Sequence, residues 1–252
     1  MDIDLNADVG ESFGAYRIGN DAALLQIVSS ANVACGAHAG DAITAWRTLE
    51  MCVKNGVAVG AHVGHRDLYG FGRREIKLGA DEAYAETLFQ IGSLRAMLRV
   101  LGARLHHVKA HGALYNQMCD DPVLCRAVAR ATRDFSATLP LVVRAGSSAT
   151  AWAMDEGCVV VEEAFLDRGY LPDGALLPRN SVAFEAVIHD AQAIQARAVQ
   201  FVRDGSVNAV DGTALFLGAR TLCVHGDTPD APALARAARE AIEAAGHSVQ
   251  AF

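Results

Sequence analysis

The sequence predicts an α/β fold in which parallel strands alternate with helices. Short β-type runs alternate along the chain with longer runs of helical periodicity. The expected strands cover residues 2–8, 30–35, 57–62, 106–111, 141–146, 159–165 and 221–226. The expected helices lie near residues 20–30, 41–55, 80–101, 121–137, 147–156, 183–204 and 230–245. This order is typical of βαβ units, so we expect either a closed or partly closed (β/α) barrel or an open doubly wound sheet.

Two of the helices carry clear local signals. In the helix near 80–101, apolar residues recur at nearly helical spacing, among them Leu88, Ile91, Leu94 and Leu98. The helix near 121 begins with "DDPVL", which combines an acidic N-cap candidate with an early proline.

Composition favours a single globular domain spanning residues 1–252. Hydrophobic residues make up 52% and charged residues 20% of the 252 residues, and the chain has no linker, repeat or low-complexity tract. A net charge of −7 argues against nucleic acid or an anionic membrane as the partner. We expect no membrane span and no signal peptide. The six cysteines are dispersed without a C-x-x-C pair, so we interpret them as reduced thiols of a cytoplasmic protein.

Polar and ionisable residues collect at the C-terminal ends of the expected strands. They are Asn6, Asp8 and Glu11; Asn32, His38 and Asp41; His62, His65 and Asp67; Lys109, His111 and Asn116; Glu162, Glu163, Asp167 and Arg168; and His225 and Asp227. In parallel α/β folds these ends face the same way and carry the site. We therefore expect most of these side chains to converge, although Asp41 is better interpreted as a helix cap.

Lys109 is the most informative of these residues. It is one of only three lysines and lies within an apolar strand, on the same side as His111. Burying an ammonium group without a partner is costly, so we expect Lys109 to line a wet, ligand-filled cavity.

The strand-end set is compatible with more than one chemistry. Asp8, His38 and His62 could hold a divalent metal that activates water. Alternatively, a histidine and an aspartate could form a general base and its orienting group, with Lys109 stabilising an oxyanion. The sequence contains neither G-x-x-x-x-G-K-[ST] nor G-x-G-x-x-G, although Arg73 and Arg74 could hold an anion.

The longest motifs resemble those of the LamB/YcsF family. They are "DLNADVGESFGAYRIGND", "SSANVACGAHAGD", "GVAVGAHVGHRDLYGFGRRE", "HHVKAHGALYN", "FLDRGYLPDGALLPR" and "LCVHGDTPDA". The resemblance covers essentially the whole chain and implies a seven-stranded (β/α) barrel of the glycoside hydrolase/deacetylase type. It also implies a role as the A subunit of ATP-dependent 5-oxoprolinase, which opens 5-oxo-L-proline to L-glutamate with subunits B and C. Ala37, Val63, His65 and Arg66 depart from the family pattern and would widen the pocket or alter its charge.

On this resemblance we assign expected roles to the site residues. The expected catalytic residues are Asp8, His38, His62, Lys109 and His111, and the expected substrate-binding residues are Glu11, Asn32, Arg73, His225 and Asp227. ATP is the expected co-substrate, handled together with the partner subunits. Two alternatives stay open: a stand-alone metal-dependent deacetylase or amidohydrolase, and a non-catalytic lactam-binding subunit. The sequence also leaves open whether copies of the chain form a homo-oligomer.

Overall fold

The computed structural model describes residues 2–179, 181 and 184–252, and its centre is a closed barrel of parallel strands. The barrel strands are β1 (Asp2–Val9), β2 (Ser30–Ala34), β3 (Ala58–Val63), β4 (Leu105–Ala110), β5 (Pro140–Arg144), β6 (Val159–Phe165) and β9 (Thr221–Val224). All seven were expected, and their bounds agree with the prediction to within a few residues.

Strand β9 closes the barrel, because it pairs with β6 on one side and with β1 on the other. Thr221 is in register with both Asp4 and Glu163, which joins the last barrel strand to the first. The open doubly wound alternative is therefore wrong, and the seven-stranded barrel is confirmed. A short strand β10 (Ser248–Val249) adds to β1 outside the closed ring.

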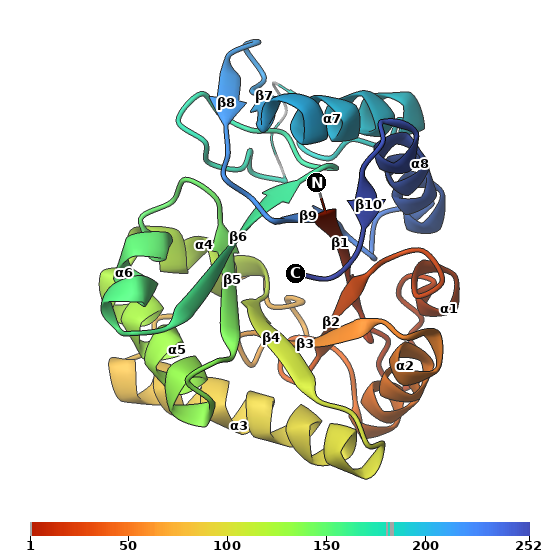
Figure 1. Ribbon diagram of the computed structural model, residues 1–252. Helices are drawn as coiled ribbons and strands as arrows, with labels where there is room; N and C mark the ends of the chain where they lie inside the picture. The colour runs from red at the N-terminus through yellow and green to blue at the C-terminus, as the bar shows by residue number, and fades with distance from the viewer. Residues whose placement is uncertain (1, 180, 182–183) are drawn as a thin grey trace.

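Helices form an outer layer around the strands (Figure 1). They are α1 (Asp21–Leu24), α2 (Ala42–Asn55), α3 (Ala80–Val100), α4 (Gly112–Asp120), α5 (Pro122–Phe135), α6 (Ala149–Asp155), α7 (Ala191–Asp204) and α8 (Ala231–Ala244). Asp41 caps α2 by accepting a hydrogen bond from the Thr44 backbone N–H, as predicted. Asp121 caps α5 in the same way, and Pro122 occupies its first turn.

Some elements differ from the prediction. Helix α7 begins at Ala191, well after the expected start at residue 183, which lies outside the described residues. Asp190 sets this start, since its carboxylate accepts hydrogen bonds from the backbone N–H groups of the first turn. The hairpin of β7 (Ser206–Asn208) and β8 (Ala214–Phe216) and helix α4 were not predicted, because each is too short for a clear periodic signal.

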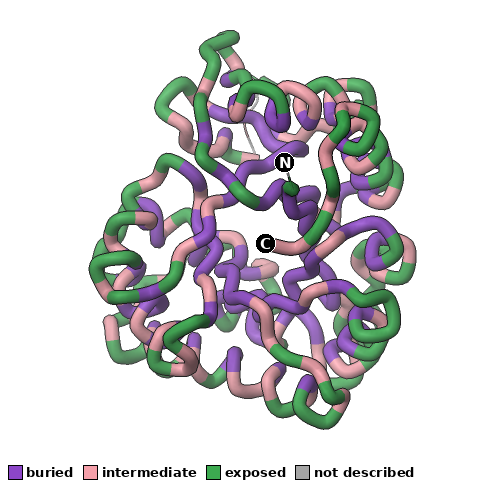
Figure 2. Tube along the Cα trace, viewed as in Figure 1, coloured by how far each residue is buried: buried purple, intermediate pink, exposed green. Residues whose placement is uncertain are grey.

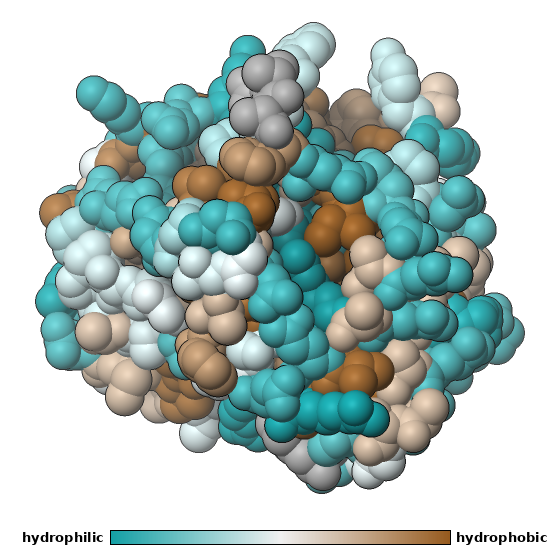
Figure 3. All heavy atoms as spheres, turned by 90° about the horizontal axis from the view of Figure 1, so that it is seen from above, coloured by the Kyte–Doolittle hydropathy of each residue, from teal (hydrophilic) through white to brown (hydrophobic). Residues whose placement is uncertain are grey.

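Burial follows the layers of the barrel. The strands are almost entirely buried, whereas exposed positions concentrate on the helices and loops outside them (Figure 2). The face that carries α7 and the β7–β8 hairpin mixes hydrophilic with smaller hydrophobic areas, as a helix layer facing water would (Figure 3). Within the described ranges, none of the helices combines the length and apolarity required to span a bilayer.

Candidate active site

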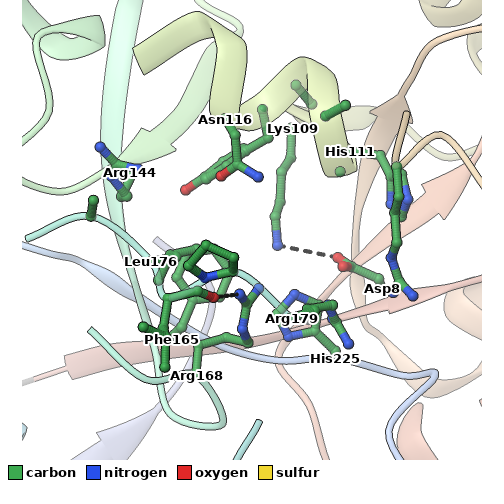
Figure 4. Close-up of a pocket in the computed structure, with 18 of the residues that line it drawn as sticks. Asp8, Lys109, His111, Asn116, Arg144, Phe165, Arg168, Leu176, Arg179 and His225 are labelled. Carbon is green, nitrogen blue, oxygen red and sulfur yellow. Dashed lines mark hydrogen bonds and ion pairs between the residues drawn. The ribbon is translucent and has the colours of Figure 1, made fainter. Parts of the chain in front are cut away.

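A cavity of about 640 Å³ lies at the C-terminal ends of the strands. Its border includes Asp8 from β1, Lys109 from β4, Arg144 from β5, and Arg168 and His225 from the loops after β6 and β9. Figure 4 shows the Lys109 amine pointing across the cavity toward Asp8, with Arg168, Arg179 and His225 below it. The predicted convergence of distant strand ends is therefore confirmed.

Lys109 is paired with two carboxylates. Its Nζ lies 2.8 Å from Glu163 Oε1 and 3.1 Å from Asp8 Oδ1. Lys109 borders the cavity as expected, but it is only 2% exposed, so carboxylates of the protein balance its charge. Burial disfavours the charged amine, but Asp8, Cys223 and Glu163 outweigh this effect and raise the pKa of Lys109 well above its usual value.

Asp8 lies between Lys109 and His62. Its Oδ2 is 3.4 Å from His62 Nε2, and Asn32 donates a 2.8 Å hydrogen bond to its Oδ1. Burial alone would raise the pKa of Asp8, but the neighbouring His62 and Lys109 hold it well below the usual value. Asn32 is not among the described residues that border the cavity. Its contribution to the site is the hydrogen bond that orients Asp8.

A second cluster of buried side chains lies beside Asp8. It consists of Glu11, His38, His62 and His111, and we call it the histidine cluster. His111 Nδ1 lies 3.0 Å from His62 Nε2, and Glu11 Oε1 lies 3.5 Å from His38 Nε2. The rings of His38 and His111 stack with their centroids 3.8 Å apart. Burial lowers the pKa of His38 and of His111, and burial together with the charge of Asp8 raises the pKa of Glu11.

His225 and Asp167 form a dyad at the other side of the cavity. Asp167 accepts a 2.9 Å hydrogen bond from His225 Nδ1, and its other oxygen accepts the His225 backbone N–H at 2.9 Å. Burial would raise the pKa of Asp167, but His225 lowers it to about 2. Because Nδ1–H points to the carboxylate, Nε2 of a neutral His225 is free to accept a proton.

Several arginines make the remaining wall cationic. Arg73 and Arg179 border the cavity, and Asp227 holds both, at 2.5 Å and 3.7 Å respectively. Asp227 itself is not among the described residues that border the cavity, and its contact with this wall is through the two arginines. Arg74 instead pairs with Asp67. Arg144 borders the cavity with a buried Nε that has no hydrogen-bond partner among the described residues.

The site residues that received no role from the sequence include Glu163, Asp167 and Arg144. Two consecutive glutamates in β6 provided a signal for Glu163, since strand alternation directs one of them into the barrel. Asp167 follows the same strand but pairs with a histidine that is 58 residues away in the sequence. Arg144 is the last residue of β5, so it occupies the same strand-end position as the other predicted site residues, and this was the signal for it.

Comparison with known proteins identifies the family of the chain. The model of the LamB/YcsF family matches residues 3–252. The chain belongs to the LamB/YcsF family. A family member from Paracidovorax citrulli, named as the A subunit of 5-oxoprolinase, is 49% identical over 252 residues, with both chains fully covered. A relative of the same name from Heliobacterium modesticaldum is 48% identical, covering 100% of this chain and 98% of the relative.

A solved structure of another relative has the same fold. The crystal structure of the lactam utilization protein from Thermus thermophilus superimposes with a TM-score of 0.94 at 47% identity, covering 100% of both chains. The four positions that were expected to alter the pocket lie away from it. Among the described residues, Ala37, Val63, His65 and Arg66 do not border the cavity, so their side chains are not part of its lining.

Proposed function

We propose that this chain is the A subunit of an ATP-dependent 5-oxoprolinase, which hydrolyses the lactam of 5-oxo-L-proline to L-glutamate. The observation that carries the proposal is the cavity at the strand ends, where a cationic wall faces a histidine–aspartate dyad. Such a cavity suits a small amide that bears a carboxylate. Relatives that carry this name, 46–49% identical over nearly their whole length, support the assignment.

The cationic wall would bind the acidic groups of the substrate. Arg144 has an unpaired buried Nε, and a carboxylate or phosphate oxygen would satisfy it. Arg73 and Arg179 are held in place by Asp227 and line the same cavity. A substrate phosphorylated on the lactam oxygen would therefore meet further cations in this cavity.

Lys109 and the dyad would divide the chemistry between them. The Lys109 amine, positioned by Asp8 and Glu163, would donate a hydrogen bond to the lactam oxygen. His225, oriented by Asp167, would take a proton from the attacking water and return it to the ring nitrogen when the C–N bond breaks. With the lactam oxygen phosphorylated, this cleavage leaves γ-glutamyl phosphate, which a second water hydrolyses to glutamate and inorganic phosphate. We give the base role to His225 instead of His62 and His111, whose ring nitrogens face each other, or His38, whose Nε2 faces Glu11.

ATP enters the proposal through the partner subunits. The sequence has no phosphate-binding loop of the G-x-x-x-x-G-K-[ST] type, so we propose that subunits B and C carry most of the nucleotide binding. We further propose that residues 1–252 form one domain and that the protein functions in the cytoplasm. The six free cysteines are compatible with a reducing compartment.

The test is reconstitution. The chain is purified with and without subunits B and C, and ATP-dependent glutamate release from 5-oxoproline is measured. We expect release only from the complete complex. His225→Gln in this chain should lower the rate at least about hundredfold, whereas His189→Gln, a change of an exposed histidine outside the cavity, should leave it unchanged. A complete complex that releases no glutamate would refute the proposed function.

The histidine cluster favours a second candidate, a metal-dependent amidohydrolase that works alone. The same assay separates the two. Glutamate release by the isolated chain with a divalent metal and without ATP would favour this candidate. Tight 5-oxoproline binding without turnover, even in the complete complex, would indicate a lactam-binding subunit.

A further inference from the structure

The histidine cluster has one ligand-type side chain from each of four successive strand ends. Glu11 follows β1, His38 follows β2, His62 lies in β3 and His111 follows β4. We propose that these four residues bind one divalent transition-metal ion, of the kind that prefers imidazole and a single carboxylate, such as Zn²⁺. The ligand set keeps two members of the group expected from the sequence, His38 and His62, and replaces Asp8 with Glu11 and His111.

The hydrogen bonds of two histidines leave a pair of lone pairs facing each other. His62 Nδ1 donates to the Lys109 carbonyl at 3.2 Å, and His111 Nε2 donates to the Phe71 carbonyl at 2.9 Å. A carbonyl oxygen can only accept, so in the neutral rings the other nitrogens, His62 Nε2 and His111 Nδ1, carry no proton. These two nitrogens lie 3.0 Å apart. A cation between them would convert a repulsive contact into two favourable bonds.

The other two members of the cluster lack partners of their own. Glu11 Oε1 and both ring nitrogens of His38 are buried without a hydrogen bond from the described residues. Leaving such groups unsatisfied costs about 1–3 kcal/mol each, and more for a charged group. Several such atoms in one place therefore indicate a ligand site rather than a packing defect.

The four ligand atoms of the cluster all lie within 4.8 Å of one another, and the closest pairs have the spacing found around a small ion. Neighbouring ligand atoms lie 3.0 Å apart for His111 and His62, 3.5 Å for His38 and Glu11, and 3.6 Å for His111 and Glu11. Ligand atoms around a tetrahedral zinc lie roughly 3.3 Å from one another when each is about 2.0–2.1 Å from the metal. The carbonyl groups of Lys109 and Phe71 would hold the His62 and His111 rings in place, and the His38 ring, which stacks parallel to His111, would have to tilt to direct Nε2 at the same ion.

The loops are shaped to hold His38 in this position. A Cβ atom at Gly64 would lie 2.5 Å from His38 Nδ1, and one at Gly72 would lie 2.6 Å from His38 Cβ. Gly72 also has a positive φ of 63°, which favours glycine. These two glycines let the chain pack closely over the imidazole, which keeps it directed toward Glu11.

A second group of potential ligands, Asp8, Cys223 and His225, does not need a metal. The Lys109 amine already lies 3.1 Å from Asp8 Oδ1 and 3.2 Å from Cys223 Sγ. It supplies the positive charge that a metal would otherwise bring. The histidine cluster has no such internal cation among the described residues, which singles it out as the metal site.

Direct metal binding by the full chain tests the proposal without ATP, lactam or the other subunits. Untagged protein is stripped with a chelator and titrated calorimetrically with Zn²⁺, and with Co²⁺ to record the visible absorption of the bound ion. We expect one ion per chain, with a Co²⁺ spectrum of low coordination number. Because no turnover is measured, failure of the proposed 5-oxoprolinase activity and failure of the metal site are separate results.

Variants locate the ion. Glu11→Gln, which keeps the shape of the side chain, and His38→Ala should each weaken binding by at least about tenfold. His189→Ala, which removes an exposed histidine outside the cluster, should bind as the unchanged chain does. Circular dichroism checks that each variant is folded, and Glu11→Gln decides the matter if His38→Ala does not fold. Absence of stoichiometric binding, or equal affinity in Glu11→Gln and His189→Ala, would overturn the proposal in favour of a proton shared between His62 and His111.

Discussion

Two buried ionic clusters lie next to each other at the same end of the barrel, and they are completed differently. Around Lys109, the ammonium group has its counter-charges, Asp8 and Glu163, within 3.1 Å. In the histidine cluster, acceptor atoms face one another and Glu11 Oε1 has no donor among the described residues. The first cluster contains its own cation, whereas the second is arranged to receive one. Buried polar groups require partners in both cases, so the two clusters differ in whether the cation is a side chain of the protein or a bound ion.

The largest effect should come from removing the internal cation. Lys109→Ala would leave Asp8 and Glu163 buried beside each other without a counter-charge. We expect the free energy of unfolding to fall by about 3–5 kcal/mol, measured by urea denaturation. Lys54→Ala, a change of an exposed lysine near the end of α2, should cost less than about 0.5 kcal/mol. Equal losses in the two variants would mean that the Lys109 cluster does not depend on its ammonium group.

The dyad offers the next largest effect. Asp167→Asn removes the negative charge that orients His225 and stabilises its protonated form. We expect the rate of glutamate release by the complete complex to fall by about hundredfold, with little change in KM. Stability should also change with pH: because the folded pKa of Asp167 is about 2, its contribution is present above about pH 4 and is lost as the pH falls toward 2. A variant that keeps the full rate would remove His225 from the base role.

Zinc binding to the histidine cluster should stabilise the fold. At a free Zn²⁺ concentration of about one hundred times Kd, binding adds about 2.7 kcal/mol of stability. For a chain of this size, that corresponds to a rise in Tm of roughly 5–10 °C, which differential scanning calorimetry would detect. Glu11→Gln should lose most of this rise. If zinc did not change the Tm of the unchanged chain, the histidine cluster would not be a cation site, and the two clusters would not differ in this way.

The smallest effect should separate two adjacent arginines. Arg73 borders the cavity, whereas Arg74 pairs with Asp67. We expect Arg73→Ala to raise the KM for 5-oxoproline in the complete complex by about tenfold, equivalent to about 1.4 kcal/mol. Arg74→Ala should change KM by less than about twofold, since its exposed ion pair contributes little. The reverse order would place the substrate outside this cavity.

The sequence alone determined the strands, most of the helices and the end of the fold that carries the site. Strand and helix periods are local properties, and the parallel arrangement makes the C-terminal strand ends converge whatever the barrel dimensions. The polar residues Asp8, His38, His62, Lys109 and His111 could therefore be placed together before any coordinates were known.

The tertiary structure alone decided how those residues are paired. Closure through β9 brings Glu163 beside Lys109, and the positions of the loops after β1 and β4 bring Glu11 and His111 to His38 and His62. Asp167 and His225 likewise meet only through the fold. Partner choice between charged groups depends on differences of about one ångström across strands, and sequence periodicity carries no information at that scale.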